Sequence, residues 1–222
     1  MFERLLKKEK APTPASVRDT LFGDMPIGEW PSNDTAGGPF ATFIRARHAI
    51  AANKPDAAIN HWLSITTTPG LESRHYLQAW HFLRQHGQQP PAEVAKDVFG
   101  VVVEVGMPEG LDILAAYADL SARYLNHAGG GVIWDHPDDS MDLQINTLLE
   151  HAQRITQKIG PWDKERPAPV GRDMLRLSML TPSGLHFGQG PVAVLSSDPF
   201  SAPMFAAATQ LLQALTEKRP PH

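Results

Sequence analysis

The sequence predicts an α+β protein: an N-terminal helical bundle packed with an antiparallel β-sheet and two further helices. Three observations support this class. Apolar residues recur at helical spacing between residues 40 and 86, β-branched or alternating runs begin after residue 97, and helical periodicity then returns in only two segments. Strands that cluster together, with helices set around them, favour an α+β fold over a doubly wound parallel one.

Composition divides the chain into four parts. These are a Pro/Gly-rich N-terminal arm (1–39), a helical part (40–96), an α+β part with the sheet (97–217) and a short tail (218–222). Proline and glycine punctuate the arm, so no regular element is expected to persist there. Its apolar side chains are suited to dock on a surface, and Phe22 and Trp30 are the predicted partner-binding residues.

Three helices are expected in the helical part, over residues 40–52, 55–68 and 71–86. Each segment carries apolar side chains on one broad face. Pro55 suits a first helical turn, and Gly87 suits a left-handed helix end. The short connections predict antiparallel neighbours in a small bundle.

The segment from residue 51 to Pro69, with Ala58, Ile59 and Leu63, resembles a tetratricopeptide helix. The Trp-Leu-Gly-Tyr spacing of that repeat is missing, and no second copy follows at its period of about 34 residues. The resemblance covers at most a quarter of the chain and implies a helical hairpin that binds proteins.

The nearly continuous valine run at residues 98–105 predicts a central strand buried on both faces. Residues 111–126 fit either a helix or a strand hairpin, and we favour the hairpin because a lone early strand needs partners. The elements expected after them are a strand at 132–134, a long helix from 141 to 159, strands at 174–181 and 185–187, and a helix from 201 onward.

Composition excludes several classes of protein. The 222 residues contain no cysteine, so disulfides and thiolate metal sites are impossible. No apolar run approaches the roughly 18 residues of a membrane-spanning helix, and the N-terminus lacks the apolar stretch of a secretory signal. A net charge of −4 without a basic face predicts no nucleic-acid partner. We therefore expect a cytoplasmic protein with no membrane or nucleic-acid partner.

Motifs for a metal or cofactor are also missing from the sequence. His75, His81 and His86 lie six and five residues apart, whereas ligands on one helical face need spacings of roughly three, four or seven. The glycine runs at 129–131 and 184–190 fit neither a phosphate-binding loop nor a dinucleotide fingerprint, and no Gly-x-Ser-x-Gly elbow exists. No metal and no cofactor are expected.

One polar constellation is a candidate site. If Leu175, Leu177 and Met179 point inward, polar side chains of the sheet gather on the opposite face. We hypothesise that they form a cleft for a small anionic ligand or for acid–base chemistry. The candidate residues are Glu104, Asp112, Arg123, Arg176 and His186.

Two functions follow from these patterns. The first is a non-catalytic interaction or accessory protein that binds another protein through the helical part or the arm. The second is a small enzyme or ligand sensor that uses the polar face of the sheet. The absence of a recognisable catalytic motif favours the first.

Overall fold

A computed structural model describes residues 14–30 and 37–218 of the chain. The parts of the arm at 1–13 and 31–36 and of the tail at 219–222 lie outside the described residues. The fold class is α+β, as predicted from the sequence.

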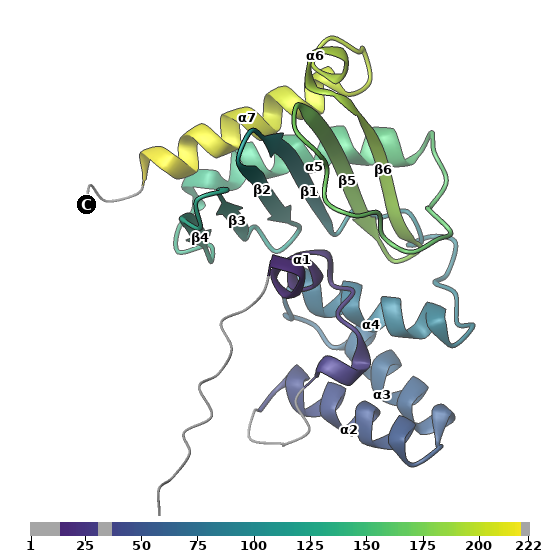
Figure 1. Cartoon of the computed structure of the whole chain (residues 1–222). Helices are drawn as coiled ribbons and strands as arrows, with labels where there is room; N and C mark the ends of the chain where they lie inside the picture. The colour runs from purple at the N-terminus through teal and green to yellow at the C-terminus, as the bar shows by residue number, and fades with distance from the viewer. Residues whose placement is uncertain (1–13, 31–36, 219–222) are drawn as a thin grey trace, which may run out of the picture.

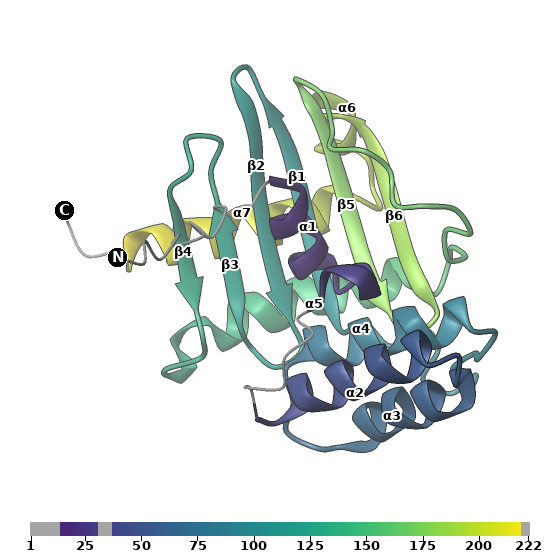
Figure 2. The same cartoon turned by 60° about the horizontal axis from the view of Figure 1, so that its bottom comes forward.

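A six-stranded antiparallel sheet with the order β4-β3-β2-β1-β5-β6 forms the middle of the structure (Figures 1 and 2). The strands are β1 (Gly100–Met107), β2 (Gly110–Tyr117), β3 (Ala122–Leu125), β4 (Gly131–Trp134), β5 (Met174–Thr181) and β6 (Gly184–Pro191). The predicted valine-rich strand is β1, which lies between β2 and β5 and is buried along most of its length. Its β-branched side chains suit a strand that is packed on both faces.

Residues 111–126 form a hairpin rather than a helix. Tyr117 N donates to Ser121 O at 3.0 Å, and Leu120 takes a left-handed φ of 64° in the turn. Both faces of this hairpin are partly covered, so apolar residues occur on each side. That burial produces spacings of three and four residues that resemble a helical stripe.

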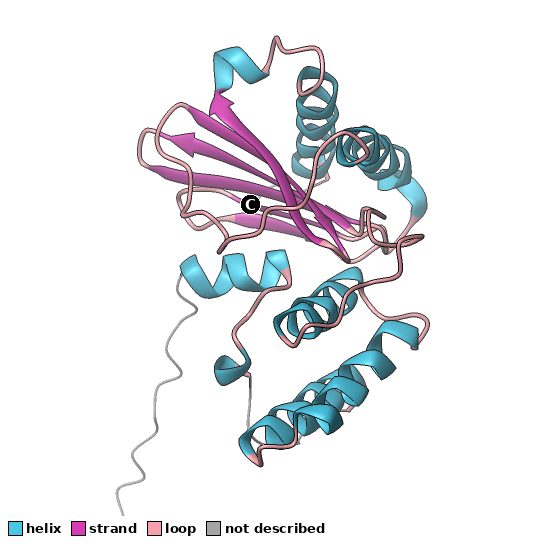
Figure 3. Ribbon diagram, turned by 90° about the vertical axis from the view of Figure 1, so that its right-hand side faces the viewer, coloured by secondary structure: helices cyan, strands magenta, loops and turns pink. Residues whose placement is uncertain are grey.

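Helices cover both faces of the sheet (Figure 3). The helices α5 (Asp142–Thr156) and α7 (Ala202–Glu217) pack on one face, around Val101, Val103 and Leu177. The helices α1 (Pro14–Phe22) and α4 (Ser73–Gln85) pack on the other face, around Val102, Tyr117 and Leu180. We call these the α5/α7 face and the α1/α4 face.

The helices α2 (Pro39–Ala51) and α3 (Pro55–Thr67) complete the predicted bundle with α4. They enclose a second core around the fully buried Trp62. Gly87 follows α4 with a φ of 77°, as expected of a left-handed helix end. The tetratricopeptide resemblance of residues 51–69 is not confirmed: the segment does form the helix α3, but one helix without the residue spacing of the repeat does not define that family.

The expectation that the arm lacks regular structure was wrong for its described residues. The helix α1 and the short η1 (Ile27–Glu29) form there. Pro14 stands at the first position of α1, where a missing N–H donor costs nothing, and Gly23 follows the helix with a φ of 63°. Tertiary burial of the apolar side of α1 outweighs the local signals of proline and glycine.

The predicted partner-binding residues are buried within the chain. Phe22 is 5% exposed and packs beside the sheet, while Trp30 is 7% exposed and stacks on Phe43 with ring centroids 4.4 Å apart. The apolar arm therefore docks on its own protein, and these two side chains do not form an exposed docking surface.

Short elements join the larger ones: η2 (Asp139–Met141) precedes α5, and α6 (Val192–Leu195) follows β6. Within residues 14–30 and 37–218, none of the helices combines the length and the apolar character needed to cross a bilayer.

Gly106 of β1 lies against residue 171 so closely that no side chain fits. A Cβ atom on Gly106 would lie 1.7 Å from the carbonyl oxygen of Gly171, whereas one on Gly188 of β6 would meet nothing within 4 Å. We expect Gly106→Ala to lower the free energy of unfolding by about 2–3 kcal/mol, because backbone must move to admit the methyl group. Chemical denaturation measures the loss. Gly188→Ala is the matched control and should change stability by less than about 0.5 kcal/mol; equal effects of the two changes would contradict the close packing.

Candidate functional site

A buried ion cluster on the α1/α4 face joins three distant parts of the chain. Glu104 of β1 accepts hydrogen bonds from Arg18 Nε of α1 and from Arg176 Nη1 of β5, each at 2.8 Å. Arg176 Nε and Nη2 also donate to Gln189 Oε1, at 2.9 and 2.6 Å. The Glu104 and Arg176 side chains can meet because these residues are direct partners in the β1–β5 register.

Residues 161–171, here called the strap, run over this cluster. Arg18 Nη2 donates to Pro167 O at 3.2 Å, and Arg176 Nη2 donates to Ala168 O at 2.8 Å. The cluster holds two guanidinium groups against one carboxylate, so the carbonyl oxygens of the strap solvate the remaining positive charge. Burial of such charges requires this kind of complete hydrogen bonding.

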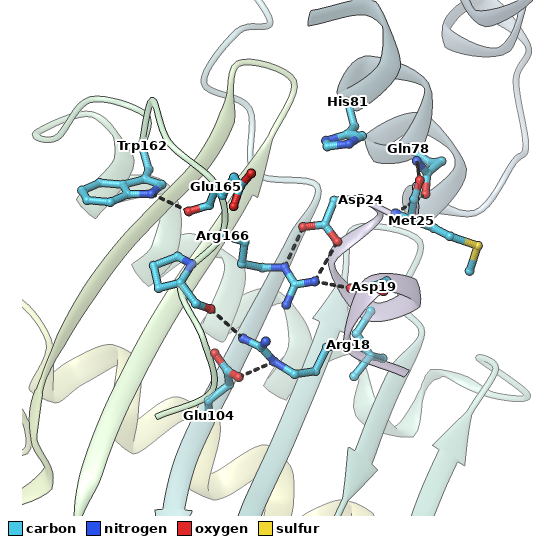
Figure 4. A network of polar contacts seen from close by, with 12 residues as sticks. Arg18, Asp19, Asp24, Met25, Gln78, His81, Glu104, Trp162, Glu165 and Arg166 are labelled. Atoms are coloured by element: carbon cyan, nitrogen blue, oxygen red, sulfur yellow. Dashed lines mark hydrogen bonds and ion pairs between the residues drawn. The ribbon is translucent and has the colours of Figure 1, made fainter. Parts of the chain in front are cut away.

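A second ion pair fastens the strap to the end of α1 (Figure 4). Arg166 Nε and Nη2 donate to the two carboxylate oxygens of Asp24, at 2.6 and 3.1 Å, and Nη2 also bonds Asp19. Burial alone would lower the pKa of Arg166, but the carboxylates of Asp24 and Asp19 raise it above its ordinary value. The strap and α1 are thus locked together.

Beside this pair lies a cleft of about 510 Å³. Its walls are the end of α1, one side of α4, the strap and the turn between β5 and β6. Apolar side chains line part of it: Phe22, Leu77, Leu180 and Leu185. Polar lining comes from Arg84, His81, Thr181 and Ser183, and Trp162 of the strap lies at its border.

Arg84 differs from Arg166, the other arginine of the cleft, in its hydrogen-bond partners. Its Nη1 donates to Pro182 O at 2.6 Å, yet among the described residues it has no carboxylate partner. Burial lowers its pKa to about 10, with Asp24 opposing that shift, so the guanidinium stays charged at neutral pH. A desolvated cation without a directly bonded carboxylate is costly, and an anion in the cleft would offset that cost.

The pKa of His81 is lowered by burial and by its place beside Arg84 in the cleft. Burial first, and then the charges of Arg84 and Arg166, lower its pKa to about 4. The imidazole is therefore neutral at physiological pH, and its Nε2 lies 3.0 Å from Gln85 Nε2.

The structure divides the five candidate residues predicted from the sequence. Glu104 and Arg176 do meet, but both are buried rather than arranged on an open face. Arg123 lies on the same face two strands away from β1, where it donates to Trp134 O at 2.8 Å and pairs with Asp135.

Asp112 and His186 lie on the α5/α7 face, so the prediction of one shared cleft was wrong for them. His186 is the cross-strand partner of Met179, and Asp112 is the partner of Val105. Cross-strand partners share a face, and a shift of one residue reverses the side of the sheet. Asp112 instead accepts hydrogen bonds from Tyr124 and His127 at 2.8–2.9 Å.

Sequence reasoning missed Arg18, Arg84 and Arg166. Arg84 stands in the last turn of α4, where a basic residue is common, and Arg166 stands in a proline-rich loop. Neither position carries a local signal of function, because their partners come from segments far away in the chain.

Comparisons of the chain with protein-family models, with curated proteins and with solved structures found no match. Nor do the described residues contain a group of three or more His, Asp or Glu side chains placed to hold a metal ion. The chemistry of the cleft is therefore the basis for a functional conclusion.

Removing the central carboxylate should expose the cost of the buried cluster. We expect Glu104→Gln to destabilise the fold by about 3–5 kcal/mol, because two guanidinium groups stay buried without a counter-charge. Urea unfolding measures this change. Glu150→Gln, at an exposed ion pair with Arg154, is the control and should cost less than about 0.5 kcal/mol. If Glu104→Gln lowers the free energy of unfolding no more than Glu150→Gln does, the cluster does not depend on the Glu104 carboxylate.

The lowered pKa of His81 makes stability depend on pH. Between its unfolded value of 6.5 and its folded value of about 4, the unfolded chain binds a proton that the folded chain does not. Stability should therefore fall as pH is lowered through this window, and His81→Gln should reduce the slope. His75 and His186 have pKa values lowered mainly by burial, so part of the slope remains. Denaturation midpoints at pH 7.5 and 5.0 test this; an unchanged slope in the variant would count against it.

Proposed function

We propose that this protein binds a small anionic molecule in the cleft, with Arg84 as the main anchor. The observation that carries the proposal is the half-buried guanidinium of Arg84, which lines the cleft and has no acidic partner among residues 14–30 and 37–218. By contrast, Arg18, Arg166 and Arg176 each contact a carboxylate. An arginine kept free of acidic partners is suited to an anion from outside.

The size and lining of the cleft support the same function. Its volume of about 510 Å³ falls in the range of roughly 300–1,000 Å³ that is typical of small-molecule sites. The ion pairs of Arg166 hold the strap against α1, and Arg84 itself is fixed by Pro182 O. A preformed site of this kind lowers the entropy cost of binding.

The hydroxyl groups near Arg84 belong to a hydrogen-bonded turn. Thr181 Oγ1 donates to Gly184 O at 3.0 Å, and Ser183 Oγ lies 2.9 Å from Thr181 Oγ1 and 3.3 Å from His186 Nε2. Burial lowers the pKa of His186, and the backbone of Ile159 opposes that shift; in the described part of the chain no carboxylate pairs with the ring, so no acid orients it for catalysis. This arrangement supports binding rather than nucleophilic chemistry.

The other expectation was that Phe22 and Trp30 bind a protein partner. Both side chains are buried within the chain, so they give that expectation no support. Anion binding is therefore the better-supported function. It also moves the ligand-sensor hypothesis from the open face of the sheet to the cleft beside the β5–β6 turn.

A thermal-unfolding screen with phosphate, sulfate, benzoate and 3-phenylpropionate tests the proposal. A bound anion at about a hundred times its dissociation constant adds roughly 2.7 kcal/mol, which should raise the midpoint by several degrees. Arg84→Ala should abolish the shift, whereas Arg154→Ala, at an exposed position of α5, should retain it. If no anion shifts the midpoint, or if Arg84→Ala shifts as far as the wild type, the proposal fails.

A further inference from the structure

We infer that the anion is a monocarboxylate with an apolar, ring-sized body, and that Arg84 binds its carboxylate through Nε and Nη2. This inference rests on the proposed function, since it names the ligand class of the same cleft. Three features of the described residues lead to it: the free edge of the guanidinium, the charge of the lining, and the apolar surface beside Arg84.

The first feature is the edge of Arg84 that remains unoccupied. Its Nη1 is bonded to Pro182 O, and its Nε and Nη2 have no hydrogen-bond partner in the described part of the chain. These two donors form one planar edge that matches the two oxygens of a carboxylate. Gly184 lies beside this edge: a Cβ atom there would be in van der Waals contact with Arg84 Nε, at 3.7 Å, and glycine omits that atom.

The second feature is the balance of charge around the cleft. The lining carries three basic side chains, Arg84, Lys164 and Arg166, and three acidic ones, Asp24, Asp163 and Glu165. Arg166 is already paired with Asp24 and Asp19. Because the acidic side chains of the lining are as many as the basic ones, a singly charged anion at Arg84 is repelled less than a phosphate monoester, whose charge is about −1.5 to −2.

The third feature is the apolar surface. Phe22, Leu77, Leu180 and Leu185 line the cleft. The first three are at most 5% exposed, so the apolar surface that is open to a hydrocarbon body comes mainly from the half-buried Leu185 and from Trp162. Trp162 adds an indole ring that is 39% exposed. Its Nε1 donates to Glu165 O at 3.0 Å and its ring meets Phe187 edge-on at 5.2 Å, so the indole is held in place for contact with a ligand.

Trp162 also provides a direct readout. The other four tryptophans, Trp30, Trp62, Trp80 and Trp134, are at most 8% exposed. A ligand in the cleft should therefore change the tryptophan fluorescence through Trp162. Trp162→Phe should remove this signal while calorimetry still detects binding, because phenylalanine keeps an aromatic ring at the border.

The experiment compares an acid and its neutral amide, which share one body, with an aromatic phosphate and with phosphate alone. The probes are 3-phenylpropionate, its neutral amide 3-phenylpropionamide, phenyl phosphate and inorganic phosphate, titrated at pH 7.5 by fluorescence and calorimetry. We expect 3-phenylpropionate to bind and the other three to bind at least tenfold more weakly. Arg84→Lys should also weaken 3-phenylpropionate at least tenfold, since an ammonium group keeps the charge but lacks the planar edge. Arg154→Ala should bind like the wild type.

The outcomes separate this inference from the proposed function. Phenyl phosphate or phosphate binding more tightly than 3-phenylpropionate, with loss in Arg84→Ala, would overturn the carboxylate and leave anion binding intact. Equal affinity for the acid and its amide would overturn Arg84 as the carboxylate anchor. If no probe, including phosphate and sulfate, binds in a manner that depends on Arg84, both proposals fail.

Discussion

The position of α1 and of the strap on the sheet depends on the hydrogen bonds of one buried carboxylate, that of Glu104. It joins α1, β1 and β5 through Arg18 and Arg176, which lie 86 and 72 residues away in the chain. A buried ion cluster is weak evidence for net stability, because desolvation can exceed the Coulombic gain. Its clear effect is geometric: the guanidinium groups of Arg18 and Arg176 share one carboxylate and also bond the strap, so α1 and the strap are held at one place on the sheet.

That fixed position creates the cleft. Once the cluster holds the strap at Pro167 and Ala168, Arg166 reaches Asp19 and Asp24 at the end of α1. The strap and α1 then stand beside α4 and the β5–β6 turn, and the space between them contains Arg84. Within residues 14–30 and 37–218, three arginines of this region are paired with carboxylates and Arg84 is not. Such an exception within a well-paired network is where a ligand is expected, because folded proteins rarely leave a desolvated charge unmatched.

The regular elements could be predicted wherever burial repeats locally. Helical spacing located α2 to α4, the valine run located β1, and alternation located β5. The apolar pattern of residues 111–126 fits both a helix and a strand hairpin. The hairpin β2–β3 is predicted only because β1 needs a neighbouring strand. The helix α1 was missed because its stability comes from Leu21 and Phe22 packing against Leu77 and Tyr117, which no local pattern reveals. The site was predicted only in part: Glu104 and Arg176 were named and do meet, whereas Arg84 was not named.

The sequence by itself determined the fold class, most of the helices and strands, and the absence of thiol chemistry, because periodicity and composition are properties of neighbouring residues. Only the tertiary structure decided which face each strand residue occupies. The β5–β6 turn pairs His186 with Met179, and that register sends the imidazole to the opposite side from Arg176. The tertiary structure also decided which charges are paired. A guanidinium finds its partner through space, so Arg18, Arg84, Arg166 and Arg176 look alike in the sequence. Only folding leaves Arg84 without a carboxylate partner among the described residues.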